Sequence, residues 1–176
     1  MFCAGRALVA ATALAAAPIT TSIATDTQIE RGKYLVELGG CSDCHTPGNL
    51  LGHPDVARYL GGSDVGFGIP GVGVFVGPNL TPDKETGLGA WSREQIVAAL
   101  TTGKRPDGRM LAEIMPWRSF ASLTPYDARA VAAYLKSLPP VAHKVAGPFG
   151  PTNTPSVLVM AVMPGEAYEK LSAAPK

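Results

Sequence analysis

Five consecutive residues, Cys41-Ser42-Asp43-Cys44-His45, constrain the fold of this chain more than any other feature. A Cys-x-x-Cys pair alone is compatible with a structural disulfide, a thiol redox pair or half of a zinc site. The histidine that follows makes the run an attachment signature for c-type haem. The two thiols bind the vinyl groups on one porphyrin edge, and the adjacent imidazole becomes an axial ligand of the iron. We therefore predict one covalent haem c on Cys41 and Cys44, with His45 bound to its iron.

The rest of the sequence favours haem over zinc and over thiol chemistry. A zinc site needs a second pair of ligands, but His53 and His143 are single and far apart. A thioredoxin-like pair opens a helix within a βαβ pattern, which this sequence does not show. The remaining cysteine, Cys3, lies in a segment that we expect to be removed.

The composition favours a fold that is completed by a large apolar group. Glycine and proline, 20 and 16 of the 176 residues, together exceed their average share of about 12% and predict little regular secondary structure. Hydrophobic residues make up 46% of the chain but aromatic residues only 7%, so a haem would supply the bulk that the core lacks. Basic and acidic residues number 15 and 14, a balance that argues against nucleic-acid binding.

The first 24 residues have the composition of an export signal. Arg6 is their only charged residue, residues 7–17 are largely apolar, and Ala24 is a small residue suited to the cleavage site. The apolar run is shorter than the roughly 20 residues of a membrane span, and Pro18 follows it, which disfavours a membrane anchor. We expect a signal peptide at 1–24 and a periplasmic protein that meets a membrane only through a complex.

Helical periodicity and capping residues predict three helices, over about 27–38, 93–102 and 125–138. A long loop rich in glycine and proline separates the first helix from the second. Within that loop, alternating valines at 72–76 predict a strand that forms a short β-hairpin with 65–67. The expected fold class is therefore mainly α, with three main helices and long loops around a covalently bound haem.

The second axial ligand decides whether the iron transfers electrons or binds a small molecule. We predict Met115, which lies in the loop between the second and third helices, where Pro116 favours an extended backbone. The alternatives are an open site or one of three other side chains, namely Met110, His53 and His143.

The chain divides into a signal peptide, a haem domain at 25–140 and a Pro-rich C-terminal extension at 141–176 that we expect to pack on the domain. Two methionines of an apolar run in this extension, Met160 and Met163, are expected to be packing residues rather than iron ligands.

Together these motifs resemble the class I cytochromes c, and more narrowly the periplasmic monohaem members that are similar to cytochrome c subunits of bacterial dehydrogenase complexes. The resemblance extends from about residue 29 to residue 140. It implies that the first and last helices cross, with Gly32 and Val36 on one side and Tyr134 and Leu135 on the other.

The resemblance also implies roles for residues around the haem. Pro78 would accept a hydrogen bond from His45, and Leu80 would pack on the ring. Trp91 is similar to a family tryptophan that reaches a haem propionate, and Met115 falls where the family places its axial methionine. Three basic side chains near the predicted distal loop are further candidates for pairing with propionates, namely Arg105, Arg109 and Arg118.

The function implied by this resemblance is transfer of one electron at a time in the periplasm, without enzymatic turnover by the chain itself. Its redox partners would be a dehydrogenase as donor and an oxidase or another cytochrome of the respiratory chain as acceptor. Two alternatives remain open: a haem-based gas or redox sensor with a labile sixth ligand, and a thiol oxidoreductase that uses Cys41 and Cys44.

Overall fold

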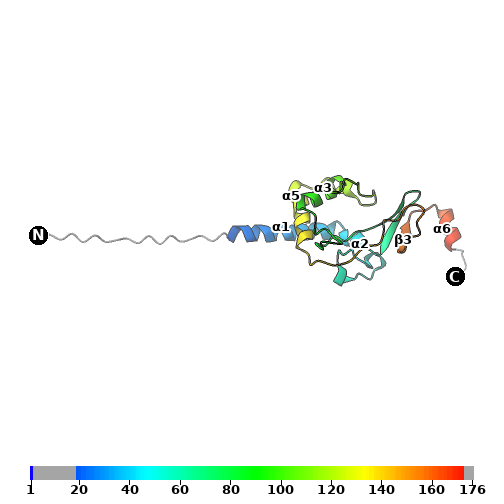
Figure 1. The fold of residues 1–176 in the computed structure, drawn as a ribbon, viewed down its shortest axis with the longest axis horizontal. Coiled ribbons are helices and arrows are strands. Elements are labelled where there is room, and N and C mark those ends of the chain that lie inside the picture. Colours follow the sequence, from blue (N-terminus) through cyan, green and yellow to red (C-terminus); the bar gives the residue numbers. More distant parts are fainter. Residues whose placement is uncertain (2–18, 173–176) are drawn as a thin grey trace.

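The computed structural model describes residue 1 and residues 19–172, which carry six α-helices and one small sheet (Figure 1). Most of the expected signal peptide, residues 2–18, lies outside the described residues. Helix α1 spans Ile19–Leu38, so the predicted start near residue 27 is wrong. No proline lies between Pro18 and the end of this helix at Leu38, and each added residue of a helix contributes a further hydrogen bond. No helix in 19–172 is both long and apolar enough to span a membrane.

Helix α1 crosses α5 (Pro125–Ser137) at a glycine. A Cβ atom at Gly32 would overlap the carbonyl oxygen of Ala130 and would lie 2.8 Å from Cβ of Tyr134. Only glycine therefore lets the two helix backbones approach this closely. Val36, one turn further along α1, is 1% exposed. The predicted crossing of the first and last helices is confirmed.

Helix α3 (Arg93–Thr102) packs against α5 and begins with a reciprocal cap. The Gln95 N–H donates to Ser92 Oγ at 3.2 Å, and the Ser92 N–H donates to Gln95 Oε1 at 2.9 Å. Gly103 ends the helix in the left-handed conformation. A single turn that the sequence did not predict, α4 (Trp117–Phe120), lies between α3 and α5. The buried core around these helices includes Leu60, Leu88, Ile96, Val131 and Leu135.

Two strands of the sheet come from the long loop and confirm the predicted hairpin. β1 (Val65–Ile69) and β2 (Gly73–Val76) pair antiparallel, with Ile69 opposite Gly73. Val72 lies in the turn between them rather than in the strand. The third strand, β3 (Leu158–Ala161), comes from the C-terminal extension and pairs parallel to β1, giving the order β2-β1-β3.

The C-terminal extension follows the surface of the haem domain before it reaches β3. The Val141 N–H donates to Thr81 Oγ1 at 3.0 Å, and Phe149 exchanges backbone hydrogen bonds with Val74 at 2.9 Å. Helix α6 (Gly165–Ser172) then lies beyond the sheet, at the end of the molecule opposite to the start of α1 (Figure 1). Two expected packing residues are exposed instead, Met160 by 48% and Met163 by 39%. Packing was the wrong expectation for them because β3 lies at the edge of the sheet.

Candidate haem-binding site

Helix α2 (Cys41–His45) is a short helix that carries the complete Cys-x-x-Cys-His run. It starts after Gly40, whose left-handed conformation (φ +61°) separates it from α1. The helical spacing of three and four residues places Cys41, Cys44 and His45 on one face. Both cysteines are partly exposed free thiols, and His45 is 6% exposed. The groups predicted to hold the haem are therefore presented together.

The orientation of His45 is set by a hydrogen bond to the segment after β2. Nδ1 of His45 lies 2.7 Å from the carbonyl oxygen of Pro78. Because a carbonyl only accepts hydrogen bonds, Nδ1 carries the proton and Nε2 keeps its lone pair. Burial lowers the pKa of His45, while the Pro78 hydrogen bond has the opposite effect. No described residue forms a hydrogen bond with Nε2, so the nitrogen that would bind iron is unpaired.

Close contact between two backbones brings Pro78 to His45. A Cβ atom at Gly77 would overlap the carbonyl oxygen of Cys44 and would lie 3.3 Å from Nδ1 of His45. Glycine is therefore required at this position if β2 is to lead into the carbonyl that orients the imidazole. Leu80, the residue that the resemblance places on the ring, is half-buried against the core, and its N–H donates to the Leu60 carbonyl at 2.8 Å.

Asn79 is a positioning residue that the sequence reasoning missed. Its side chain is fully buried, and Oδ1 accepts hydrogen bonds from Thr81 N–H at 2.9 Å and from Thr81 Oγ1 at 2.7 Å. Its Nδ2 donates to Thr86 Oγ1 at 3.1 Å and to the Val141 carbonyl at 2.7 Å. A buried amide that is paired at both ends fixes its own segment. Asn79 thus holds Pro78 in place and ties it to the C-terminal extension.

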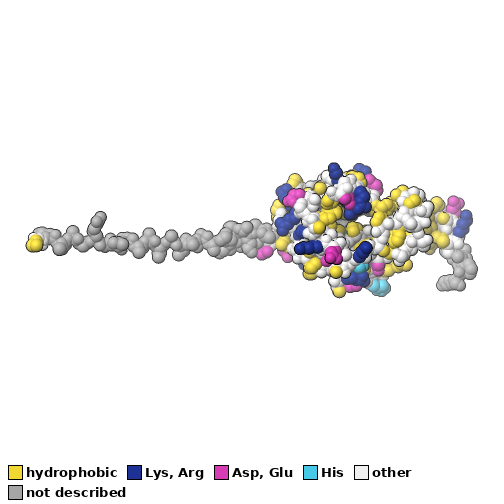
Figure 2. Space-filling model, in the orientation of Figure 1, with side chains coloured by type: hydrophobic (Ala, Val, Ile, Leu, Met, Phe, Trp, Pro, Cys, Tyr) yellow, Lys and Arg dark blue, Asp and Glu magenta, His cyan; other side chains and the backbone are white. Residues whose placement is uncertain are grey.

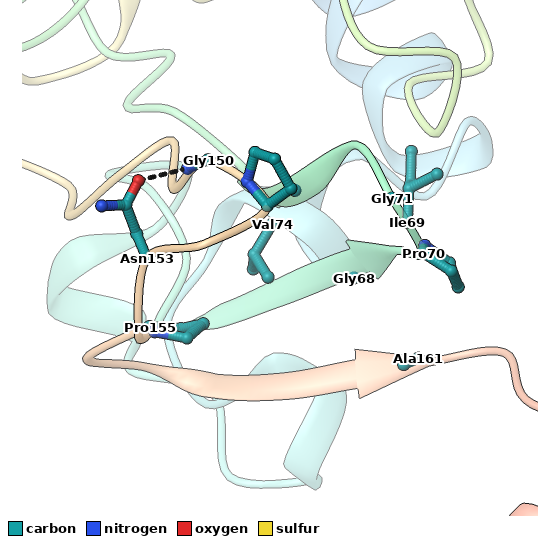
Figure 3. Close-up of a pocket in the computed structure, with 11 residues that line it drawn as sticks. Gly68, Ile69, Pro70, Gly71, Val74, Gly150, Asn153, Pro155 and Ala161 are labelled. Carbon is teal, nitrogen blue, oxygen red and sulfur yellow. Dashed lines mark hydrogen bonds between the residues drawn. The ribbon is translucent and has the colours of Figure 1, made fainter.

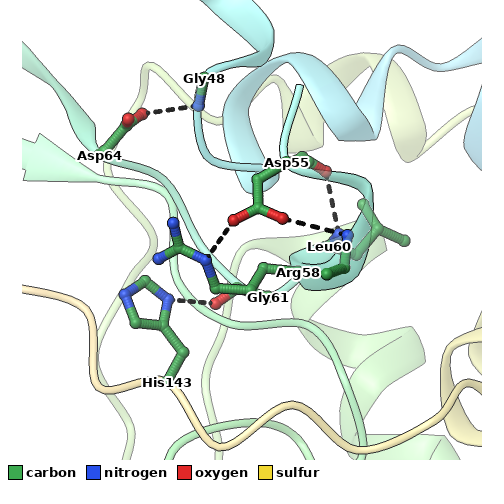
Figure 4. Close-up of polar contacts among 9 residues, drawn as sticks. Gly48, Asp55, Arg58, Leu60, Gly61, Asp64 and His143 are labelled. Carbon is green, nitrogen blue, oxygen red and sulfur yellow. Dashed lines mark hydrogen bonds and ion pairs between the residues drawn. The ribbon is translucent and has the colours of Figure 1, made fainter. Parts of the chain in front are cut away.

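Polar contacts also fix the loop that follows α2 (Figure 4). The Arg58 Nε donates to the Asp55 carboxylate at 2.7 Å, which lowers the pKa of Asp55. His143 Nδ1 donates to the Gly61 carbonyl at 2.7 Å, so this alternative iron ligand connects the extension to the loop. His53, the other alternative histidine, is exposed.

The environment of the two thiols does not suit thiol redox catalysis. Burial raises the pKa of Cys41 to about 11, and burial also raises the pKa of Cys44. A catalytic Cys-x-x-Cys pair needs a lowered pKa, because the thiolate is the nucleophile. Among residues 19–172, no group of three His, Cys, Asp or Glu side chains is arranged to hold a metal ion. The geometry therefore favours haem attachment over the redox-pair and zinc interpretations.

The predicted distal ligand lies in the loop between α3 and α4. Met115 is half-buried, its N–H donates to the Ala112 carbonyl at 2.9 Å, and its carbonyl accepts from Trp117 N–H at 2.8 Å. Met110, the alternative in the same loop, is 56% exposed and pairs with Lys104 in an isolated β-bridge. Met115 is thus the less exposed of the two thioethers in this loop.

Two buried nitrogen atoms near the distal loop have no hydrogen-bond partner among the described residues, namely Nε1 of Trp117 and Nε of Arg105. The Trp117 ring lies against Gly103, where a Cβ atom would be 2.7 Å from the indole. Arg105 Nε is 3.4 Å from an Asp107 carboxylate oxygen, an ion pair without hydrogen-bond geometry. Buried donors without acceptors are uncommon, and a haem propionate is an acceptor that would satisfy them. These residues fit the group that the motif predicts.

Trp91 is the tryptophan to which the resemblance assigns a propionate contact. It is half-buried, and the guanidinium carbon of Arg105 lies 5.4 Å from the centre of its ring. Its position depends on Lys136 of α5. The Lys136 ammonium donates to the carbonyls of Leu88, Gly89 and Trp91 at 3.2, 2.9 and 3.1 Å. The indole whose buried N–H has no acceptor among the described residues is that of Trp117, which directly follows the Met115-Pro116 pair in the sequence.

A thiol pair and an oriented imidazole lie on one short helix, within a fold in which α1 crosses α5 and α3 packs against α5. Together these features define a c-type cytochrome. In agreement, a family model for cytochrome c matches residues 29–139, more than half of the chain. The chain belongs to the cytochrome c family, whose members bind haem c covalently and transfer electrons.

Its relatives include cytochrome subunits of larger enzymes. It is 37% identical over 113 residues to the fructose dehydrogenase cytochrome subunit of Gluconobacter japonicus, covering 62% of this chain and 22% of the relative. It is 42% identical over 117 residues to a dihaem c-type cytochrome of Cereibacter sphaeroides, covering 64% and 36%. It is 32% identical over 134 residues to the gluconate 2-dehydrogenase cytochrome c subunit of Pantoea cypripedii, covering 74% and 28%. The chain therefore spans about a third or less of the length of these relatives.

Proposed function

We propose that this chain is a periplasmic carrier of single electrons, with one haem on Cys41 and Cys44 and with His45 and Met115 as the iron ligands. The observation that carries the proposal is the His45 geometry. Its Nδ1 is held 2.7 Å from the Pro78 carbonyl while Nε2 has no hydrogen-bond partner among the described residues, on the same helical face as both thiols. One Cys-x-x-Cys-His run in the 176 residues supports a single haem.

The haem would supply a one-electron couple between Fe(III) and Fe(II). The residues of the chain orient this group and control its surroundings. The Pro78 carbonyl fixes the tautomer and raises the basicity of the His45 imidazole. Met115 would contribute an uncharged thioether to the iron, and a ligand of this kind favours the reduced state. Trp117 and Arg105 would supply buried N–H groups for the propionates.

The proposed electron donor is a dehydrogenase, and the proposed acceptor is an oxidase or another cytochrome of the respiratory chain. Support for the donor comes from relatives that are named as cytochrome subunits of fructose dehydrogenase and gluconate 2-dehydrogenase. The periplasmic location rests on the export signal composition of residues 1–24. In this scheme the chain transfers electrons and the partner carries out the substrate chemistry.

Optical spectroscopy and mass spectrometry of the periplasmically expressed protein test the proposal. We expect the mass increase of one haem and, in the ferric state, the far-red band of methionine-to-iron ligation. Met115→Ala should abolish this band, while the control Met110→Ala should keep it. A band that survives Met115→Ala would show that the ligand assignment is wrong. A mass without haem would refute the haem proposal, and ready binding of carbon monoxide by the reduced wild type would identify a sensor instead.

A further inference from the structure

The C-terminal extension presents an exposed apolar strand outside the region matched by the cytochrome c family, which ends at residue 139. We call residues 157–163, which contain β3, the edge segment; all seven are apolar. All four residues of β3 itself are exposed, and Val162 just after it is 89% exposed. Contiguous exposed apolar surface of this kind marks an interaction site in a soluble protein. The large apolar side chains that contribute to it are Leu158, Val159, Met160, Val162 and Met163.

The backbone of β3 is also unpaired along one side. Its register with β1 pairs Val65 with Leu158 and Gly68 with Ala161. In the sheet order β2-β1-β3, no described strand lies on the other side of β3. Proteins usually protect such an edge with lysine, an internal proline or a bulge. The edge segment contains neither lysine nor proline, so its backbone N–H and C=O groups can pair with another strand.

Both strands of the hairpin and the part of the extension around the edge segment lack charged side chains. Residues 65–82 and residues 145–165 contain no Asp, Glu, Lys or Arg. Figure 2 shows the consequence on the face drawn: the part of the surface between the helical domain and α6 is yellow and white, with dark blue and magenta returning at α6. Such a surface cannot select a partner by opposite charge. Two identical copies of it, however, meet without repulsion.

Symmetry then identifies the occupant that fits this edge. A two-fold axis beside β3 places the strand antiparallel to its own copy, so each edge offers the donors and acceptors that the other needs. We propose that a second copy of this chain pairs with β3, forming one continuous sheet in the order β2-β1-β3-β3-β1-β2 across the dimer. The apolar side chains of the edge segment are covered by the same contact.

A groove next to the end of β3 provides further contact area. It has a volume of about 280 Å³ and lies between the β1–β2 turn and residues 150–155 (Figure 3). Its lining is uncharged, and Ala161 contributes to it directly. In the dimer, an apolar side chain of the partner copy would occupy this groove. Helix α6 adds two exposed side chains at a spacing of three residues, Tyr168 and Leu171.

The dimer has a consequence for the haem-binding site. β2 leads into Gly77 and Pro78, which contact α2 and His45. With neighbouring strands about 4.8 Å apart, the two β2 strands of the dimer would lie roughly 24 Å from each other. The dimer would thus hold two haem-binding units together, one in each chain. The relative from Cereibacter sphaeroides is itself named as a dihaem protein.

Sedimentation velocity of the haem-loaded mature protein tests the dimer, over about a hundredfold range of concentration. We expect twice the monomer mass at the upper end for the wild type. Val162→Lys should weaken the dimer at least about tenfold, because a lysine on the edge opposes pairing. Val56→Lys is the matched control, since Val56 is 79% exposed on another element. Both variants should keep the wild-type visible spectrum, which shows that the haem domain is intact.

Cross-linking locates the contact independently of any loss of stability. Residues directly opposite in an antiparallel pair have Cα atoms about 4.5–5.5 Å apart, within reach of a disulfide. Only the residue at the two-fold axis lies opposite its own copy, so one of the four single cysteine variants along β3 (Leu158→Cys, Val159→Cys, Met160→Cys and Ala161→Cys) should give a covalent dimer on oxidation. Val56→Cys should not.

Three results would overturn the proposal. They are a monomer at every concentration, a dimer that Val162→Lys leaves unchanged, and the absence of a cross-link at all four β3 positions. If the wild type is a monomer and Val162→Lys slows its reduction by a dehydrogenase while Val56→Lys does not, the edge binds the dehydrogenase. In each case the visible spectrum of the same samples reports separately on the proposed electron carrier.

Discussion

Replacing Gly77 with alanine tests whether the close contact between the β2 end and α2 orients His45. The added Cβ would overlap the Cys44 carbonyl oxygen and lie 2.8 Å from the Cys44 carbonyl carbon. Both are backbone atoms of a residue that the proposed haem would also anchor, so they cannot move aside as a flexible side chain would. Overpacking of this kind costs about 1–3 kcal/mol. A Gly→Ala substitution can also stabilise a protein by about 0.4–1 kcal/mol, because alanine lowers the conformational entropy of the unfolded chain. This gain is obtained only where the folded site accepts alanine without strain.

Thermal unfolding followed by circular dichroism and haem absorbance measures this cost. At roughly 4 °C per kcal/mol, Gly77→Ala should lower Tm by about 4–12 °C. A longer hydrogen bond from His45 to Pro78 makes the imidazole less basic, so it donates less electron density to the iron. The reduction potential of the haem should therefore also rise. The control is Gly165→Ala, where no atom lies within 4 Å of the added Cβ, and its Tm should change by no more than surface substitutions usually cause.

The reasoning would be refuted by a Gly77→Ala protein with the Tm and the potential of the wild type. A lower Tm with an unchanged potential would show that the contact stabilises the fold without acting on the imidazole. Loss of haem attachment in Gly77→Ala would be a stronger form of the expected effect, because Cys44 itself is displaced.

Three further predictions concern the helices that frame the site. Lys136→Met removes the ammonium that holds the Trp91 segment, so denaturant unfolding should show a loss of about 2 kcal/mol, largely recovered in Lys136→Arg. Thr124→Ala removes the hydroxyl that caps α5 and should cost about 1 kcal/mol in the same measurement. The hydrogen bond from Arg31 lowers the pKa of Asp127, and a lowered folded pKa contributes stability above the unfolded value near 3.9. Wild type should therefore exceed Asp127→Asn in stability at neutral pH, and this difference should vanish as the pH falls through the folded pKa of Asp127; a pH-independent difference would contradict the ion-pair assignment.

Local signals in the sequence were sufficient for α3, α5 and the hairpin. Each of these elements has its caps, stops or alternation within a few residues, as with Ser92 and Gln95 around the start of α3. Strand β3 has no such signal, because its partner β1 is far away in the sequence and the apolar run 157–163 does not alternate. Parallel pairing depends on long-range contacts, which periodicity does not record. The exposure of Met160 and Met163 follows from the same missed strand.

The motif residues could be named from the sequence because their chemistry is tied to a fixed spacing. Asn79 and Trp117 could not, since their roles depend on which buried partners surround them. Asn79 pairs with Val141 across a large sequence separation, and Trp117 is distinguished only by a buried N–H that no described residue accepts. A polar atom becomes informative only when its burial is known.

The two sides of the site are stabilised in different ways, so the chain fixes one of the two proposed iron ligands more firmly than the other. Pro78 is held by Asn79, whose side chain donates hydrogen bonds to the C-terminal extension, far away in the sequence. In the described structure, the hydrogen bonds of residues 104–116 are all local, because every partner lies within residues 102–120. The stacking of Arg105 on Trp91 is a longer-range contact of that loop. The His45 side is therefore preorganised by protein contacts, whereas the position of Met115 would depend more on the proposed bond to the iron. For this reason Met115→Ala should alter the distal loop while the hydrogen bond from His45 to Pro78 persists, and proton NMR of the His45 ring N–H can verify this.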